Sequence, residues 1–177
     1  MVKKLLVVAT VCGLFAGLAH AELIEVSING GFESGNFYGW SLFPSPDDVI
    51  EIVSPGVDSD FAARIYNVAT TSGSVIKNAN LLVLGEGYAP GAPVFISFDA
   101  RGVGMAGGVA FAEFFSEIEG GGTSSSEILG GGPLALDPDP EVWTHFEFEV
   151  LTGPDTSGGV TVQFAAVTGA EEGSTME

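Results

Sequence analysis

Cysteine is almost absent from this sequence of 177 residues. The one example, Cys12, lies in an apolar N-terminal segment, and no cysteine follows it. If that segment is removed, disulfides, thiol redox chemistry and a cysteine nucleophile are all excluded. Val11 precedes Cys12 and is too large for a good lipoprotein cleavage box, so we expect no lipid attachment at this cysteine.

Basic residues are also scarce, with five Lys and Arg against 23 Asp and Glu and a formal net charge of −18. Lys3 and Lys4 belong to the N-terminal segment, which leaves only Arg64, Lys77 and Arg101 beyond it. Such a chain repels nucleic acid and anionic lipid headgroups. Neutral sugars, cations and basic partners remain compatible with it. The acidity does not by itself establish calcium binding, because a saline habitat favours the same composition.

Motifs of known catalytic sites are missing. The sequence has no Gly-x-Ser-x-Gly, no His-Glu-x-x-His and no phosphate-binding loop. Beyond the N-terminal segment the one histidine is His145, which shares a strand face with Glu147 and Glu149 and is best interpreted as part of a solvated surface. Pairs of carboxylates arise by chance among so many acids and do not indicate a glycosidase. We therefore predict that the protein is not an enzyme.

Residues 1–21 have the pattern of a secretory signal peptide. Lys3 and Lys4 are followed by an apolar run from Leu5 to Leu18 and by a small-residue cleavage site at Ala19–Ala21. The alternative is a retained membrane anchor, for which the run is short. We predict bacterial export into the extracellular space, no membrane association after cleavage, and one domain over residues 22–177.

Alternating apolar and polar residues predict β-strands in the rest of the chain. The clearest pattern is in residues 94–101, where Val94, Ile96 and Phe98 are expected to face the core. Residues 120–126 and 130–133 are rich in Gly and Ser and are predicted to be mobile loops. No helical stripe follows the N-terminal segment, so we predict two antiparallel sheets in an all-β jelly-roll sandwich. The other expected strands are 23–28, 49–53, 61–67, 74–77, 81–84, 109–119, 142–151 and a run from 160.

The stretch from Asn29 to Trp40 combines a sharp turn with two apolar anchors. Gly30 and Gly31 permit backbone conformations with positive φ, and Phe32 and Trp40 are large enough to close the end of a sandwich. Glu33 lies beside the first of these anchors. Its carboxylate either faces solvent in a wet turn or, with nearby carbonyl oxygens, holds a hard cation such as calcium.

This stretch also carries a resemblance. Asn29-Gly-Gly-Phe-Glu33 followed by Gly39-Trp40 resembles the opening of the carbohydrate-binding modules of families 4 and 9, and of many exported bacterial PEP-CTERM proteins. Residues 94–101, 141–148 and 160–169 agree with it, so the likeness runs from about Leu23 to the end. It implies a galactose-binding-like jelly roll that recognises a polysaccharide. The Pro-Glu-Pro sorting signal of PEP-CTERM proteins is absent.

The resemblance also implies a metal site and a further strand. The family's calcium position corresponds to Glu33, and the place of Asp58 and Asp60 in the turn at 55–60 makes them candidate partners. The family's other carboxylate lies on a closing strand, and Gly173–Glu177 looks like the approach to such a strand. Either the sequence is a fragment or this strand has been lost. In both cases we expect the chain that ends at Glu177 to be marginally stable, aggregation-prone or dimeric through the edge beside residues 23–28.

Sugar binding requires aromatic faces for stacking and polar groups for hydroxyls. Among outward residues that also include Glu113 and Trp143, the residues predicted to bind the ligand are Arg64, Tyr66, Asp99, Arg101, Phe115 and Gln163. Salt bridges to neighbouring acids are the alternative role for Arg64 and Arg101. Trp40 and Trp143 are expected to pack against the sandwich rather than to form binding platforms.

Three functions are compatible with these observations. The first is a secreted, non-catalytic carbohydrate-binding module for an extracellular polysaccharide. The second is a structural or adhesive extracellular-matrix protein of the PEP-CTERM type. The third is an accessory domain of a larger glycoside hydrolase. The DNA downstream of the Glu177 codon discriminates between them, because a sorting signal there favours the second function and a hydrolase domain favours the third.

Overall fold

The computed structural model describes residues 6–10, 23–81 and 88–177. Within this part of the chain the regular structure is β-strand apart from one short 3₁₀ turn, η1 (Leu129–Gly131). No helix in these ranges has the length and apolar character needed to cross a bilayer. The predicted all-β class is confirmed.

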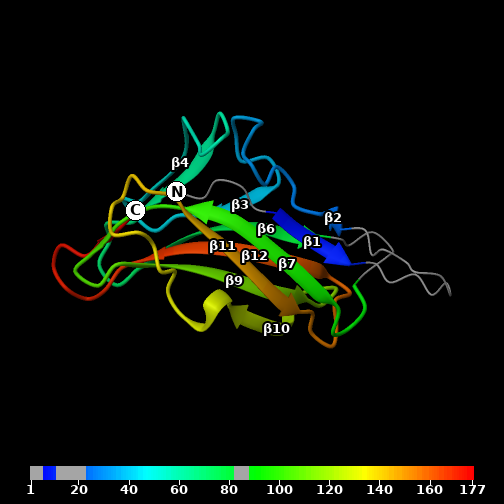
Figure 1. The fold of residues 1–177 in the computed structure, drawn as a ribbon. Helices are drawn as coiled ribbons and strands as arrows, with labels where there is room; N and C mark the ends of the chain where they lie inside the picture. The colour runs from blue at the N-terminus through cyan, green and yellow to red at the C-terminus, as the bar shows by residue number, and fades with distance from the viewer. Residues whose placement is uncertain (1–5, 11–22, 82–87) are drawn as a thin grey trace.

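Two antiparallel sheets form the layers of a sandwich (Figure 1). The four-stranded sheet has the order β11 (Thr144–Leu151), β7 (Pro93–Ala100), β1 (Leu6–Thr10) and β2 (Leu23–Glu25). The five-stranded sheet has the order β10 (Thr123–Ile128), β9 (Val109–Glu117), β12 (Gly159–Val167), β6 (Gly73–Leu81) and β3 (Trp40–Phe43). In Figure 1, β7 and β11 cross in front of β9, β12 and β6.

Two further strand pairs lie outside these sheets. The first is an antiparallel pair of β4 (Val49–Val53) and β5 (Ala62–Tyr66), and the second joins β8 (Gly104–Met105) to β13 (Thr175–Met176). Backbone hydrogen bonds join Glu177 to Val103 in both directions, and others join Met176 to Asn67. The last residues of the chain are thus held between two distant segments, and Met176 is buried.

The core lies between the two sheets, on the faces that the alternation predicts. Val94, Ile96 and Phe98 of β7 are almost completely buried, as are Phe114 of β9 and Val162 of β12. A large apolar side chain that is fully buried contributes about 1.5–3 kcal/mol to folding. The period-2 pattern of the sequence therefore predicts the inward faces of these strands correctly.

Aromatic rings connect the two layers. Phe98 of the four-stranded sheet meets Phe164 of the five-stranded sheet edge to face, with ring centroids 4.8 Å apart. On one side Phe98 stacks with Phe146 at 5.2 Å, and on the other Phe164 lies 6.2 Å from Trp40. Trp40 in turn contacts Phe32 at 4.9 Å. Trp40 is therefore a core residue, as the sequence analysis expects.

The Asn29–Trp40 loop is organised by one asparagine side chain. The Nδ2 group of Asn29 donates to the carbonyl oxygens of Asn36 and Tyr38, and the backbone N–H of Ser34 donates to its Oδ1 atom. Trp40 Nε1 donates to the backbone oxygen of Asn29 at 3.1 Å. Asn29 has a positive φ of 52°, a conformation that asparagine tolerates better than most residues. The loop thus holds its two aromatic anchors in place.

Two loop predictions are wrong. Residues 74–77 and 81–84 are predicted as separate strands around Asn78–Asn80, but β6 continues from Gly73 to Leu81. Asn78 is fully buried and bonds to Ile28 and Gly39, so a polar side chain stabilises the strand where the sequence suggests a break. Residues 123–128, predicted in part to be mobile, form β10 against β9. There the serines take part in an edge strand rather than a free loop.

The N-terminal segment contributes a strand. Leu6–Thr10, within the predicted signal peptide, forms β1, which pairs antiparallel with β7 on one side and with β2 on the other. The cleavage site at 19–21 and part of the strand expected at 81–84 lie outside the described residues. Signal cleavage and export stay predictions. The strand predicted to begin at Leu23 therefore pairs with β1.

Candidate functional site

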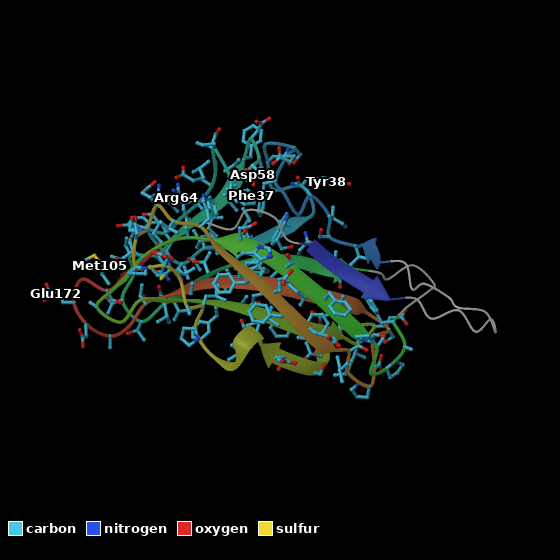
Figure 2. All side chains as sticks on the ribbon, in the orientation of Figure 1. Phe37, Tyr38, Asp58, Arg64, Met105 and Glu172 are labelled. Carbon is cyan, nitrogen blue, oxygen red and sulfur yellow. The ribbon has the colours of Figure 1, made fainter. Side chains whose placement is uncertain are left out.

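The six predicted ligand residues lie in three separate places. Arg64 and Tyr66 are on β5, Asp99 and Arg101 belong to β7 and its end, and Phe115 and Gln163 lie on β9 and β12. The structure does not bring the three pairs together. Figure 2 shows all side chains on the ribbon and labels Arg64 near the β4–β5 pair.

Arg64 is the centre of an ion-pair network. Its Nε atom lies 2.9 Å from Glu177 Oε1, and its Nη1 atom lies 2.9 Å from Glu51 Oε1. The Glu177 hydrogen bond is the largest cause that raises the pKa of Arg64. The guanidinium also lies 5.3 Å from the ring centroid of Tyr66. The Nε and Nη1 donors of Arg64 are engaged within the protein, which matches the salt-bridge alternative.

Arg101 is engaged in a similar way at the end of β7. Its Nη1 atom lies 2.8 Å from Glu141 Oε2, and its guanidinium lies 5.0 Å from the ring centroid of Trp143. Trp143 is partly buried under this contact, so the indole packs against the sandwich, in line with the expected packing role. Both cations are therefore engaged in ion pairs within the protein.

A Ser–His–Asp arrangement lies on the outer face of the four-stranded sheet. His145 Nδ1 is 2.9 Å from Asp99 Oδ1, and its Nε2 is 3.5 Å from Ser97 Oγ. The hydrogen bond with Asp99 is the largest cause that raises the pKa of His145. The second carboxylate, Glu147, lies 3.6 Å from Nε2. These contacts favour the charged imidazolium rather than a neutral base.

This arrangement lacks the remaining requirements of a hydrolase. The three residues lie on the paired strands β7 and β11, where the backbone N–H groups are directed within the plane of the sheet rather than towards the outer face, so they form no oxyanion hole beside His145. The His145 side chain is 54% exposed. We interpret the group as a surface hydrogen-bond network.

The outer face of the five-stranded sheet gathers aromatic and polar side chains over four strands. The strand register places Ser41, Lys77, Gln163 and Glu113 in one row that runs across β3, β6, β12 and β9. Phenylalanines lie in the adjacent rows. We call this surface the aromatic–polar face and define it by Phe43, Lys77, Phe111, Glu113, Phe115 and Gln163.

Lys77 lies at the centre of the aromatic–polar face. Its Nζ atom is 5.4 Å from the ring centroid of Phe115 and 5.5 Å from that of Phe43. Both distances are within the range of cation–π attraction. Phe43 remains 53% exposed, so at least one ring of this group presents its surface to solvent.

Gln163 and Glu113 are joined side by side. The Nε2 group of Gln163 donates a hydrogen bond to Glu113 Oε2. Gln163 is buried and Glu113 is half-buried, so the second carboxylate oxygen of Glu113 is the acceptor of this pair that a ligand can reach. It suits hydrogen-bond donors such as sugar hydroxyls.

Of the residues that define the aromatic–polar face, the sequence pattern suggested Phe115 and Gln163 as ligand residues but not Lys77 and Phe43, and a ligand role for any of them stays a prediction. The signal for Lys77 was present: its neighbours Ile76 and Asn78 are fully buried, so alternation sends Lys77 outward. The wrong break at Asn78 concealed that pattern. For Phe43, the short strand β3 between a glycine and two prolines carries no alternation that identifies it.

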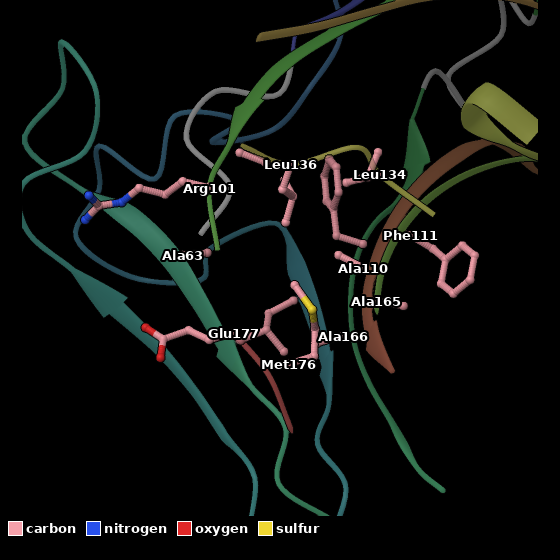
Figure 3. Close-up of a pocket in the computed structure, with 13 residues that line it drawn as sticks. Ala63, Arg101, Ala110, Phe111, Leu134, Leu136, Ala165, Ala166, Met176 and Glu177 are labelled. Atoms are coloured by element: carbon pink, nitrogen blue, oxygen red, sulfur yellow. The ribbon is translucent and has the colours of Figure 1, made fainter. Parts of the chain in front are cut away.

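Cavities near the C-terminus are less suited to a sugar. The first, shown in Figure 3, has mostly apolar walls that include Ala63, Leu134 and Met176 and a volume of about 30 Å³. That is room for about one water molecule. A larger depression of about 380 Å³ lies nearby, between Val103, Leu136 and Pro138, and has no aromatic residue. In Figure 3 the ring of Phe111 points away from Leu134 and Met176.

The predicted calcium residues are only partly brought together. The backbone N–H of Asp60 lies 3.4 Å from Glu33 Oε2, so Glu33 does reach the following turn. Glu33, Asp58 and Asp60 lie at the surface. Within residues 23–81 and 88–177 no group of three or more His, Cys, Asp or Glu side chains is close enough to hold a metal ion. The described side chains therefore do not form a complete calcium site, and calcium binding stays a prediction.

Comparisons with known proteins find similar folds but no matching sequence. No known protein family and no curated protein matches the sequence. Among solved structures, the enzymatically active domain of tailspike protein 4 of bacteriophage CBA120 is similar, with a TM-score of 0.57 and 11% identity. That match covers 85% of this chain and 20% of the tailspike chain.

Two xylanase-derived structures are also similar. The CBM22-1–GH10 modules of Clostridium thermocellum xylanase 10B, complexed with xylohexaose, match with a TM-score of 0.51 and 13% identity over 98% of this chain and 27% of that one. The CBM22-2 xylan-binding domain of Paenibacillus barcinonensis Xyn10C matches with a TM-score of 0.47 and 19% identity, over 82% of this chain and 90% of that one. The fold is a jelly-roll sandwich. This chain spans only about a fifth to a quarter of the tailspike and xylanase 10B chains.

Proposed function

We propose that this protein is a secreted, non-catalytic module that binds an extracellular polysaccharide through the aromatic–polar face. The observation that carries this proposal is the row of Lys77, Gln163 and Glu113 across adjacent strands, flanked by the rings of Phe43 and Phe115. Aromatic faces stack on pyranose rings, and polar groups beside them bond hydroxyls. Arg64, Asp99 and Arg101, which the sequence also suggested as ligand residues, are paired elsewhere in the protein.

The shape of this face suits a polymer better than a small molecule. The row crosses β3, β6, β12 and β9, and neighbouring strands lie about 4.8 Å apart, so its side chains span roughly 14 Å. Several sugar units along a chain fit such a length. The similarity to the xylanase 10B modules, whose structure holds xylohexaose, supports this class of ligand.

The other two hypotheses assign the aromatic–polar face to a different kind of complete protein. An accessory domain of a glycoside hydrolase is supported by the match to xylanase 10B, in which such a module is joined to a GH10 module. A structural or adhesive extracellular-matrix role of the PEP-CTERM type rests on the resemblance at Asn29–Trp40 alone. Both use polysaccharide binding and therefore share the first experiment.

Affinity electrophoresis tests the proposed function. The purified, folded protein is run in native gels that contain xylan, β-glucan, galactan, glucuronoxylan, pectin or alginate, with bovine serum albumin as the non-binding control. We expect retardation on at least one of these polymers, relative to a gel without polymer. If the folded protein migrates identically in every gel, the proposal is wrong.

A further inference from the structure

The three basic residues beyond the N-terminal segment differ in their partners. Arg64 is paired with Glu51 and Glu177, and Arg101 with Glu141. In the part of the chain that the structure describes, the Lys77 ammonium has no hydrogen bond or ion pair, only the two phenylalanine rings. In a chain with 23 acidic residues, an ammonium without a carboxylate is an exception.

Building on the proposed function, we propose that Lys77 binds the carboxylate of a uronic acid, so that this module selects acidic polysaccharides. A lysine ammonium carries three N–H donors, and its contact with the rings leaves these available to a ligand. The rings of Phe43 and Phe115 also keep water from two sides of the ammonium. An ion pair is stronger there than on an open surface, because the effective dielectric constant is lower.

The geometry fits a stacked uronate. A uronic acid carries its carboxylate on an exocyclic carbon, beyond the edge of the pyranose ring. Lys77 Nζ lies over both aromatic rings, 5.4 Å from the centroid of Phe115 and 5.5 Å from that of Phe43, so a sugar that packs against these rings brings its carboxylate to the ammonium. The second carboxylate oxygen of Glu113 lies in the same row and suits a hydroxyl group of the sugar. One face thus offers aromatic rings, a cation and a hydroxyl acceptor.

Glu113 is the carboxylate of this row that opposes an acidic ligand. Gln163 separates Lys77 from Glu113, which places the two charged residues about two strand spacings, or about 10 Å, apart. The Debye length at physiological ionic strength is about 8 Å, so salt screens most of this repulsion. The contact between Lys77 and a bound carboxylate is short and partly shielded from solvent, and is screened much less.

Matched polymers that differ only in charge test the proposal. Polygalacturonate, glucuronoxylan and alginate are each compared with a carboxyl-reduced form of the same polymer, by isothermal titration at about 150 mM salt, which is physiological ionic strength. We expect at least one acidic polymer to bind about tenfold or more tightly than its reduced form, as charge-assisted hydrogen bonds predict. Lys77→Gln should abolish that preference, and Lys77→Arg should retain it. Thr70→Glu, which makes the same change in net charge at an exposed loop residue, should leave it unchanged.

The outcomes separate this inference from the proposed function. Equal or tighter binding of the reduced polymers, or a preference that survives in Lys77→Gln, overturns the role of Lys77 while polysaccharide binding stands. A wild-type protein that binds no polymer in either form overturns both. Circular dichroism confirms that each variant is folded before its binding is measured.

Discussion

Lys77 Nζ lies 5.4 Å from the ring centroid of Phe115, although these residues belong to strands that are separated by β12. The contact spans β12 because Gln163 and Thr161, on the intervening strand, are buried beneath neighbouring side chains. Long side chains from β6 and β9 therefore meet over shorter or recessed ones on β12. This relationship defines the centre of the aromatic–polar face.

Asn78 should be essential for stability. Its side chain bonds to the backbone of Ile28 and Gly39 while completely buried, so Asn78→Ala leaves those groups unsatisfied. We expect a loss of at least about 1–3 kcal/mol in the free energy of unfolding, measured by urea denaturation. Ser41→Ala, at an exposed position of β3, is the control and should change stability little. An Asn78→Ala variant as stable as wild type would show that these bonds contribute nothing.

His145 should have a raised pKa that depends on Asp99. The hydrogen bond to Asp99 favours the imidazolium, so Asp99→Asn should lower the pKa of His145 towards its ordinary value of about 6.5. Because the folded-state pKa is the higher one, the pair stabilises the fold fully below about pH 6.5 and loses this effect as the pH rises through the folded-state pKa. NMR titration of the His145 ring protons measures both proteins. Identical pKa values in the two would contradict the assigned contact.

Calcium binding can be tested at Glu33. If Glu33 and the following turn hold calcium, then calcium should raise the melting temperature, because it binds only the folded state. Glu33→Gln keeps the shape of the side chain and should abolish the rise. Magnesium at the same concentration is the control for general screening of the acidic surface. An equal rise in the mutant, or with magnesium, would exclude a specific site at Glu33.

Removal of residues 1–21 removes β1 and should expose two strand edges in the four-stranded sheet. β7 and β2 both pair with β1, so each is left with unpaired N–H and C=O groups that favour association with another strand. We expect the shortened protein to self-associate or to melt at a lower temperature than the full chain, as analytical ultracentrifugation and calorimetry can show. A stable, monomeric shortened protein would mean that β1 is dispensable for the fold.

The sequence predicted the layers of the sandwich better than its loops. Alternation is decisive where one face is fully buried, as in β7, because a register error there exposes Val94, Ile96 and Phe98 together. Alternation is misleading where a buried polar side chain forms hydrogen bonds inside the protein. Asn78 is such a residue, since its partners at Ile28 and Gly39 are distant in sequence and become visible only in the fold.

The site was predictable only in part for a similar reason. Parity places Phe115 and Gln163 on the outward face, but it does not say which outward strands share a sheet. Arg64 and Arg101 are outward as well, yet they lie on other strand pairs and are ion-paired with Glu51, Glu177 and Glu141. Strand order, which depends on long-range pairing, separates the residues of the aromatic–polar face from the rest.

Titration of matched phenylalanine variants with a polysaccharide ligand tests the central claim most directly. The polymer that most retards the wild type in affinity electrophoresis is titrated into the wild type, Phe115→Ala and Phe95→Ala. Phe95 is a partly exposed phenylalanine on β7, on the outer face of the opposite sheet, and is the matched control. We predict that Phe115→Ala weakens binding about tenfold or more, as the loss of an aromatic contact does, and that Phe95→Ala binds as the wild type does. Equal affinity of Phe115→Ala and the wild type, or a loss confined to Phe95→Ala, would contradict binding at the aromatic–polar face.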